Sequence, residues 1–390
     1  MKIRSIKANP VNIPFTAPYR FSYGSMASLT KTVIELQTED GVIGLGELAD
    51  GDRARDVEAM AEKLIGMDVR EINLAEQRCV PQMLYTPWGN ITADRRVFGG
   101  IEMAMWDARG RTEGVPLHTL LGGAVRTEVA LTEYFAYRLP GESDPGQDSP
   151  AEIADFCARM IDEFGAREFE GKVATRDLGE EIEMVRAVRD AIGDRRLSLD
   201  ANGAWTLPAA REAIGRFDRF DIHCYEDPVE TYTEMADLRA ITRASFSTHI
   251  ANLPEAGRLR APDAIVTNLN EHGGVSGTVA FIRACALMDI GFRFHSGETG
   301  IASTAYLHVS AAMEHVREAS QTILRWYGDD VIEGGPLCPR SGVLAVPQGP
   351  GLGVELDRKA LARCHQRYLE EGAFPSGTPG GQYGGAFRKS

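Results

Sequence analysis

Short apolar runs alternate with helical patterns from residue 129 to residue 324, and this alternation restricts the fold more than any other feature of the chain. Parallel strands need long crossover connections, usually helices, so alternating strand and helix patterns are typical of a parallel sheet. All but the last of the candidate strands are followed by a helical pattern or a short loop. We therefore predict a modified (β/α)7β barrel of the α/β class. The eight candidate strands are residues 129–131, 167–173, 197–200, 222–226, 246–250, 264–267, 291–294 and 322–324.

The segments on either side of this pattern have a different character. Three strand-like alternations lie before residue 50, and helical patterns follow them. Strand character returns after Gly342. We predict an α+β capping domain of residues 1–125, to which residues 340–390 return, and a barrel domain of residues 126–339.

Composition limits the possible partners and compartments. The chain has 390 residues, of which 43% are hydrophobic, and its formal net charge of −14 argues against a nucleic-acid or anionic-membrane partner. None of the six cysteines forms a Cys-x-x-Cys pair, which favours free thiols in a reducing compartment. The N-terminus has no apolar core of signal-peptide length, and no apolar stretch is long enough to span a bilayer. We expect a cytoplasmic protein.

Two neighbouring candidate strands each end in a carboxylate. Asp200 ends the run that begins at Leu197, and Glu226 ends the run that begins at Ile222. The C-terminal ends of barrel strands form one face, and neighbouring strands lie roughly 4.8 Å apart, so the two acids can share a divalent cation. Oxygen ligands of this kind suit Mg²⁺. For either acid alone, an N-cap of the following helix is the competing interpretation.

The other strand ends carry further candidates. Lys172 lies in an otherwise apolar run, and partial burial near a cation would lower its pKa and make it a usable general base; the alternative is a surface lysine. His249 or Asn252 could complete the metal site, or either could be an ordinary loop residue. Asn268 follows the sixth candidate strand. His295 follows the seventh, where a histidine could act as acid or base or could simply bridge two loops.

Five motifs spread over nearly the whole length carry a family resemblance. With these motifs the chain resembles the enolase superfamily, in its mandelate racemase and muconate-lactonising branch, and most nearly the glucarate dehydratase-like acid-sugar dehydratases. The motifs are Gly44-Leu45-Gly46-Glu47, Phe98-Gly99-Gly100-Ile101-Glu102-Met103-Ala104-Met105-Trp106-Asp107, Asp200-Ala201-Asn202-Gly203-Ala204-Trp205, Tyr225-Glu226-Asp227-Pro228 and Gly349-Pro350-Gly351-Leu352-Gly353-Val354-Glu355.

The resemblance implies a metal-dependent lyase. It implies one essential Mg²⁺ and removal of the proton α to a substrate carboxylate, giving a metal-stabilised enediolate. Loss of the β-hydroxyl would then give a 2-keto-3-deoxy acid, which is the reaction of a hydro-lyase acting on an aldonate or aldarate in carbohydrate-acid metabolism. The alternatives are a racemase or epimerase that uses 1,1-proton transfer, and a non-catalytic metal- or ligand-binding descendant. We expect a small carboxylate or acid-sugar substrate, a homo-oligomer, and neither a nucleic-acid nor a membrane partner.

Carried over by position, the resemblance assigns roles to individual residues. Asp200, Glu226 and His249 match the metal ligands, Lys172 matches the second lysine of the family's Lys-x-Lys motif, and His295 matches the base of its His–Asp dyad. Loops at residues 15–25 and 50–55 would close over the substrate. The residues expected to contact substrate are Tyr23, Glu170, Asn202 and Glu298.

Three positions depart from the family pattern. Glu170 stands where the first lysine of Lys-x-Lys is expected, and Asn268 stands where the dyad aspartate is expected to orient His295. His249 replaces an oxygen ligand. Because imidazole suits Mn²⁺ or softer divalent metals better than Mg²⁺, either the metal is softer or Asn252 or water takes the third position.

Overall fold

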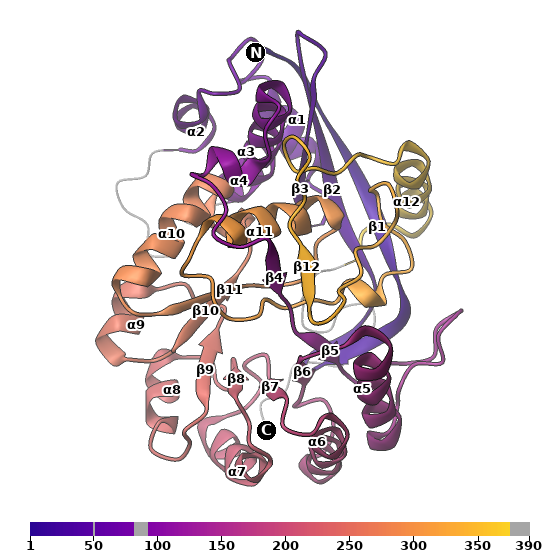
Figure 1. Ribbon diagram of the computed structural model, residues 1–390, viewed down its shortest axis with the longest axis vertical. Helices are drawn as coiled ribbons and strands as arrows, with labels where there is room; N and C mark the ends of the chain where they lie inside the picture. The colour runs from indigo at the N-terminus through magenta and orange to yellow at the C-terminus, as the bar shows by residue number, and fades with distance from the viewer. Residues whose placement is uncertain (50, 82–92, 375–390) are drawn as a thin grey trace.

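The computed structural model describes residues 1–49, 51–81 and 93–374, and in Figure 1 a sheet-and-helix cap lies above a curled parallel sheet. The cap sheet is antiparallel in the order β1-β2-β3. Helix α3 packs closely on this sheet where glycines from both elements meet. A Cβ atom at Gly46 would lie only 2.1 Å from the carbonyl oxygen of Gly100, so no side chain fits there. The cap elements are β1 (Ile3–Phe21), β2 (Gly24–Thr38), β3 (Ile43–Leu48), α1 (Ala54–Ala61), α2 (Ile72–Cys79), α3 (Ala93–Glu113) and α4 (Leu117–Leu120).

The barrel region is a seven-stranded sheet in which every neighbouring pair of strands is parallel, in the order β11-β10-β9-β8-β7-β6-β5. Helices α5 to α10 lie on its outer side in Figure 1. Local signals start these helices, as at α6, where the Asp177 side chain accepts a hydrogen bond from the backbone N–H of Glu180. The elements are β5 (Glu133–Phe135), α5 (Pro150–Phe164), β6 (Glu168–Lys172), α6 (Leu178–Ile192), β7 (Arg196–Asp200), α7 (Leu207–Phe217), η1 (Asp218–Phe220), β8 (Cys224–Glu226), α8 (Tyr232–Leu238), β9 (Ser245–Thr248), α9 (Leu253–Leu259), β10 (Ala264–Thr267), η2 (Asn270–His272), α10 (Val275–Leu287), β11 (Gly291–Phe294) and α11 (Gly300–Ala312).

Two of the predicted barrel strands are wrong. The run at 129–131 falls in β4 (Glu128–Ala130), which pairs antiparallel with β12 (Val343–Ala345), and the first barrel strand is β5 instead. Both runs are short and apolar, and only their pairing partners tell them apart. Residues 322–324 do not form the predicted strand. An isolated bridge joins the preceding Ser320 to Leu131, and the chain then enters the 3₁₀ helix η3 (Leu324–Trp326).

The chain also differs from prediction around residue 20. Residues 15–25 were expected as a loop, but β1 continues to Phe21 and β2 begins at Gly24, so the segment is the end of a long hairpin. Its aromatic side chains pack on one another, for example Phe21 on Tyr23, which explains how a sequence rich in aromatics remains extended. The predicted second loop at 50–55 includes Asp50, which lies outside the described residues.

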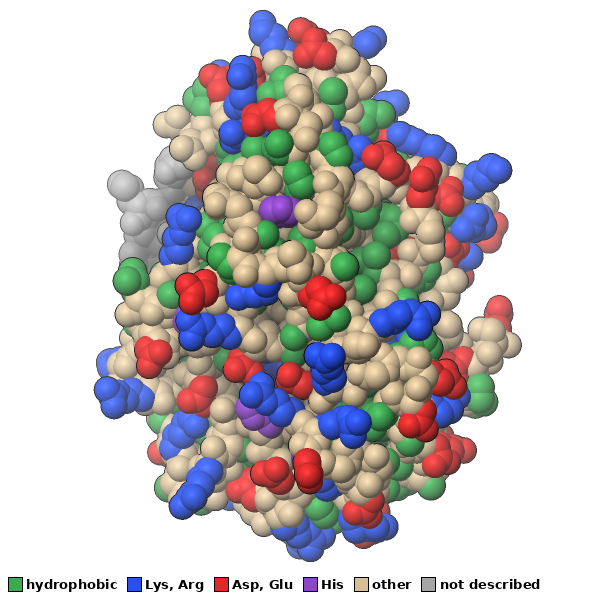
Figure 2. All heavy atoms as spheres, in the orientation of Figure 1, with side chains coloured by type: hydrophobic (Ala, Val, Ile, Leu, Met, Phe, Trp, Pro, Cys, Tyr) green, Lys and Arg blue, Asp and Glu red, His purple; other side chains and the backbone are tan. Residues whose placement is uncertain are grey.

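The C-terminal segment returns to the cap. Helix α12 (Arg358–Glu371) lies beside β1 in Figure 1, where Nδ1 of His365 lies 2.7 Å from the carbonyl oxygen of Pro10. Figure 2 shows Lys and Arg side chains interspersed with Asp and Glu on the face drawn, so neighbouring charges offset one another. Among the described residues, no helix is both long enough and apolar enough to cross a bilayer.

Candidate active site

Asp200 and Glu226 lie directly opposite each other at the ends of two parallel strands. The register pairs Asp200 of β7 with Glu226 of β8 and, on the other side, with Lys172 of β6. Asp200, Glu226 and Lys172 are all buried. The barrel geometry inferred from the sequence therefore brings the two candidate ligands and the candidate base together at one strand-end face.

Hydrogen bonds hold the Asp200 carboxylate in one orientation. It accepts from the hydroxyl of Tyr134 at 3.0 Å and from the backbone N–H and side-chain amide of Asn202 at 2.8 and 3.2 Å. Asn202 can reach back in this way because it lies in the left-handed region, with φ of 50°. The motif that begins at Asp200 is thus a tight turn that aims the carboxylate, a role for Asn202 besides its predicted substrate contact.

Lys172 donates a short hydrogen bond to Asp200. Burial alone would lower the pKa of Lys172, but the negative charges of Asp200 and Glu226 outweigh it, and the pKa lies above its ordinary range. These charges oppose the fall in pKa that burial beside a cation would produce. The direct contact between Lys172 and Asp200 cannot be read from the sequence of either strand.

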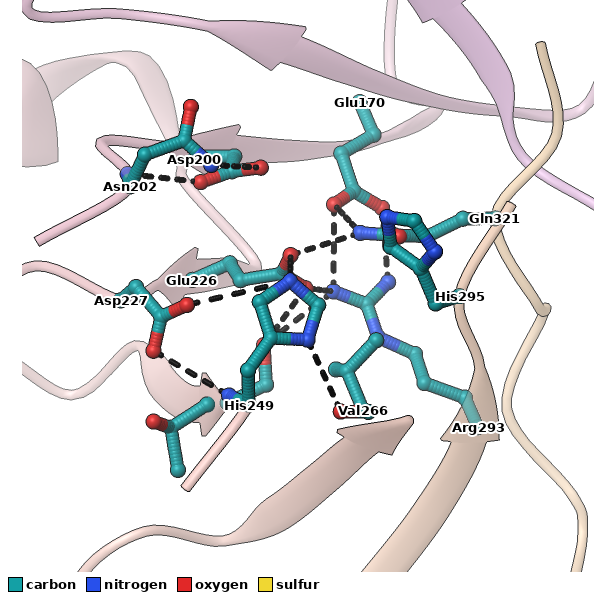
Figure 3. A network of polar contacts seen from close by, with 12 residues as sticks. Glu170, Asp200, Asn202, Glu226, Asp227, His249, Val266, Arg293, His295 and Gln321 are labelled. Carbon is teal, nitrogen blue, oxygen red and sulfur yellow. Dashed lines mark hydrogen bonds and ion pairs between the residues drawn. The ribbon is translucent and has the colours of Figure 1, made fainter. Parts of the chain in front are cut away.

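A second set of side chains lies around Glu226. Nε2 of His249 lies 3.4 Å from Glu226 and 3.9 Å from Asp227, and Figure 3 shows the imidazole directed at both carboxylates. Nδ1 of His249 lies 2.9 Å from the carbonyl oxygen of Val266. A carbonyl can only accept, so Nδ1 carries a hydrogen, and the neutral imidazole of His249 would present the lone pair of Nε2 to a metal. Glu226, Asp227 and His249 present ligand atoms within 4.8 Å of one another.

Asp227 was missed in the sequence, and Asn252 was overestimated. Asp227 follows Glu226 in the Glu-Asp-Pro motif and joins the ligand set, with its pKa raised to about 6 by burial and by Glu226 against the opposing effect of His249. Asn252 is exposed, and its side-chain oxygen accepts from the backbone N–H of Glu255 as the N-cap of α9. The geometry supports His249 rather than Asn252 as the third ligand.

Behind these residues, Arg293 of β11 reaches across the barrel interior. It donates to Glu170 at 2.7 Å and to Glu226 at 2.6 Å, and the amide of Gln321 bridges the same two carboxylates at 2.7 Å each. Burial would raise the pKa of Glu226, but Arg293 and His249 outweigh it and lower that pKa to about 2. Burial and the neighbouring carboxylates raise the pKa of Glu170, which lies in this network and is not among the residues that line the cavity over the strand ends.

Arg293 and Gln321 were also missed. An arginine in the apolar run Gly-Phe-Arg-Phe was as strong a signal as Lys172 in its own strand, because an unpaired buried charge is expensive. Arg293 could therefore have been identified in the sequence in the same way as Lys172. The sequence could not identify Glu170 as the partner of Arg293, because Glu170 lies on β6, near the opposite end of the sheet from β11.

Charge balance tests whether these residues fit a divalent cation. Among the described residues, the carboxylates of Glu170, Asp200, Glu226 and Asp227 gather around the cationic side chains of Lys172 and Arg293 and the titratable imidazole of His249. Buried like charges are costly unless a cation offsets them. With His249 neutral, as a metal ligand must be, the excess of two negative charges equals the charge of one divalent ion, and Asp200, Glu226, Asp227 and His249 supply oxygen and imidazole donors. The site fits the metal, although the imidazole is more typical of Mn²⁺ or a softer ion than of Mg²⁺.

A cavity of about 490 Å³ opens over these strand ends. Its barrel wall includes Lys172, Asn202, His249, Asn268 and His295. Its cap wall includes Tyr19, Phe21, Tyr23, Met26, Leu29 and Lys31. The cavity therefore contains both predicted proton-transfer residues and two of the four predicted substrate contacts, Tyr23 and Asn202.

The predicted partnership of Asn268 and His295 is absent from the described part of the chain. The side-chain oxygen of Asn268 accepts from the backbone N–H of Glu271, and no hydrogen bond joins it to His295 there. The carboxylate that faces His295 is Glu298, which lies 4.0 Å from Nδ1. Burial would raise the pKa of Glu298, but His295 and Lys31 outweigh it and lower that pKa. Glu298 thus lies beside the imidazole rather than in the cavity wall where substrate would bind.

Comparison with known proteins gives matches over both parts of the chain. Residues 152–360 match the family "Enolase C-terminal domain-like", and residues 3–122 match "Mandelate racemase / muconate lactonizing enzyme, N-terminal domain". A probable glucarate dehydratase of Streptomyces coelicolor is 29% identical over 87% of this chain and 86% of its own length.

Two solved structures are similar throughout. An enolase of Thermobispora bispora, complexed with magnesium and formate, is 29% identical with a TM-score of 0.86 over 95% of this chain and 94% of its own. An enolase of Mycobacterium smegmatis, complexed with tartrate, is 29% identical with a TM-score of 0.87 over 95% of this chain and 93% of its own.

Proposed function

The chain belongs to the enolase superfamily, and from this premise we propose that it is a divalent-metal-dependent hydro-lyase that dehydrates an acid sugar. One observation supports this most directly: a cluster of buried carboxylates contacts Lys172 and His249, which line a cavity that also contains His295. The acid-sugar class is supported by the glucarate dehydratase relative and by the small carboxylates bound to similar structures.

The protein's own residues would perform three tasks. Asp200, Glu226 and His249, with Asp227 beside them, would hold the cation. When bound, a divalent cation supplies positive charge that stabilises the charge developing on a carboxylate as its α-proton leaves. Lys172 and His295 would move the protons: one removes the α-proton and the other donates a proton to the departing β-hydroxyl. Which residue does which depends on the face of the substrate that carries each group.

The cap would complete the cavity. Tyr19, Phe21, Tyr23 and Lys31 come from the N-terminal sheet and form one wall over the barrel strand ends. Exclusion of water from such a site strengthens each electrostatic contact inside it. We accordingly propose the division of the chain into a cap of residues 1–125 with 340–390 and a barrel of residues 126–339 as a functional one, although residues 375–390 lie outside the described part.

A second activity has support in the same geometry. Two proton-transfer residues in one cavity could act on the two faces of a single α-carbon, which gives a racemase or epimerase and needs no leaving group. The proposed dehydration differs from this only in the fate of the β-hydroxyl.

A panel of acid sugars in D₂O, with Mg²⁺ or Mn²⁺ added, separates these activities. The proposal expects exchange of the α-proton for deuterium together with a 2-keto-3-deoxy product. Exchange with an inverted substrate would establish an epimerase instead. Tight binding of an acid sugar with neither exchange nor product would show that the protein is a binder and would refute the enzymatic proposal.

A further inference from the structure

The cavity contains a cationic side chain that the proposed chemistry does not use. Lys31 lies on β2, lines the cavity and is only 4% exposed. Its ammonium donates to the carbonyl oxygen of Ala49 at 2.9 Å. Within residues 1–49, 51–81 and 93–374, that carbonyl is its one hydrogen-bond acceptor, and no carboxylate there lies within ion-pair distance of it.

The other cations of the cavity wall have carboxylate partners. Lys172 pairs with Asp200, and Arg96 pairs with Glu271 at 2.7 Å. An ammonium has three N–H donors, and burying it with a single neutral acceptor is unfavourable. Lys31 therefore differs from Lys172 and Arg96. One hydrogen bond fixes its position, but its other N–H groups have no acceptor among the described residues.

The surroundings of Lys31 hold it at the seam between cap and barrel. The backbone N–H of Ala49 donates to the side-chain oxygen of Asn270 at 3.0 Å, which ties the anchoring carbonyl to the loop after β10. Burial raises the pKa of Glu47, and Lys31 opposes that rise; burial would also raise the pKa of Glu298, but His295 and Lys31 lower it. Glu47, however, accepts hydrogen bonds from Thr299 and from the backbone of Ala302, so it is engaged by the start of α11.

The positions of Lys31 and the carboxylate cluster define two anion-binding ends of one cavity. At the barrel end, a cation held by Asp200 and Glu226 would take one substrate carboxylate. On the cap wall, among Phe21, Met26 and Leu29, the ammonium of Lys31 is available for a second anionic group. We propose that Lys31 binds the distal carboxylate of the substrate, so that the preferred substrates are aldarates, which carry two carboxylates, rather than aldonates, which carry one. This inference rests on the proposed function only in placing the first carboxylate at the metal end.

The test compares matched acids that differ at one end. Hexarates and the hexonates of the same configuration are titrated into the Mg²⁺-loaded protein by calorimetry, and kcat/KM is measured for each. The wild type should bind the hexarate about 10- to 100-fold more tightly, the range expected for one charge-assisted hydrogen bond in a buried site. Lys31→Met should remove that preference, mainly through KM, because it should weaken hexarate binding far more than hexonate binding. Lys31→Arg should keep part of the preference.

The outcomes separate this inference from the proposed function. Equal affinity of the wild type for hexarate and hexonate would by itself refute the proposed role of Lys31. A preference for the hexarate that persists in Lys31→Met would also overturn it, and Lys31→Gln provides a second charge-neutral variant if the methionine variant is unstable. Binding that favours hexarates through Lys31 without α-proton exchange would uphold the inference while refuting the dehydratase. Exchange of the α-proton with formation of product, but without a hexarate preference that depends on Lys31, would uphold the dehydratase and refute the inference about Lys31.

Discussion

The guanidinium of Arg293 donates a hydrogen bond of 2.6 Å to the carboxylate of Glu226. The same guanidinium holds Glu170 at 2.7 Å, so two carboxylates from β6 and β8 share one cation from β11. This arrangement gives a reason for the glutamate where the family resemblance expects a lysine. In this chain the positive charge is the guanidinium of Arg293, which reaches in from β11, and Glu170 binds that guanidinium.

Breaking this network should destabilise the protein strongly. Arg293→Met leaves Glu170 and Glu226 buried without their shared cation, and we expect a loss of roughly 3–5 kcal/mol in the free energy of unfolding, measured by urea denaturation. Arg186→Met is a matched control, because Arg186 pairs with Glu183 and Asp190 on the exposed face of α6. That variant should cost less than about 1 kcal/mol. Similar losses in the two variants would contradict the account of Arg293.

Metal preference should depend on His249. Replacing His249 by Glu converts an imidazole donor into an oxygen donor beside Glu226 and Asp227, so Mg²⁺ affinity should rise relative to Zn²⁺ affinity. Calorimetric titration of both metals into the apoprotein measures this ratio. Asn252→Ala is the control: Asn252 caps α9 at the surface, and its loss should leave the affinity for either metal unchanged. If Asn252→Ala weakens metal binding and His249→Glu does not alter the ratio, the third ligand has been misassigned.

A buried histidine pair predicts acid sensitivity at the cap–barrel junction. Nδ1 of His118 lies 3.0 Å from Nδ1 of His308, and burial lowers the pKa of His308 to about 4. Since this folded-state pKa lies below the ordinary value near 6.5, the neutral form contributes stability that is complete above about pH 6.5 and is lost as the pH falls towards 4.

The slope of the unfolding free energy with pH measures this effect. Between pH 6.5 and 4, His308→Gln should reduce the slope by as much as about 1.4 kcal/mol per pH unit. An unaltered slope in His308→Gln would show that His308 is not held neutral by the fold.

Lys172 and His295 should both be needed for turnover. Lys172→Ala and His295→Asn should each lower kcat by roughly 10²–10⁴-fold, the usual contribution of a proton-transfer group, while the protein still binds one equivalent of metal. The two variants should differ in exchange of the α-proton, because only the group that removes the proton is needed for that half-reaction. Full activity in His295→Asn would place another residue at the substrate.

The sequence predicted the parts of this site that depend on local order. Asp200, Glu226 and Lys172 end consecutive strands, so the parallel register alone brings them together. The sequence could not predict that Arg293 would bind Glu170, because that contact crosses the barrel between strands far apart in the chain. Nor could it distinguish β4 from β5, since two short apolar runs differ only in their distant partners. The expected role of Asn268 failed similarly, because the carboxylate near His295 comes from the following loop.

The central claim is that Asp200 and Glu226 hold a divalent cation on which removal of the substrate α-proton depends. The most direct measurement is NMR of α-proton exchange in D₂O with an acid sugar that the protein binds. Three samples are compared: the metal-loaded wild type, the same protein after chelation, and the metal-supplemented double variant Asp200→Asn, Glu226→Gln. We predict exchange in the first sample alone, with recovery when Mg²⁺ or Mn²⁺ is returned to the chelated wild type. Exchange at an unchanged rate in the chelated protein or in the double variant would contradict the account.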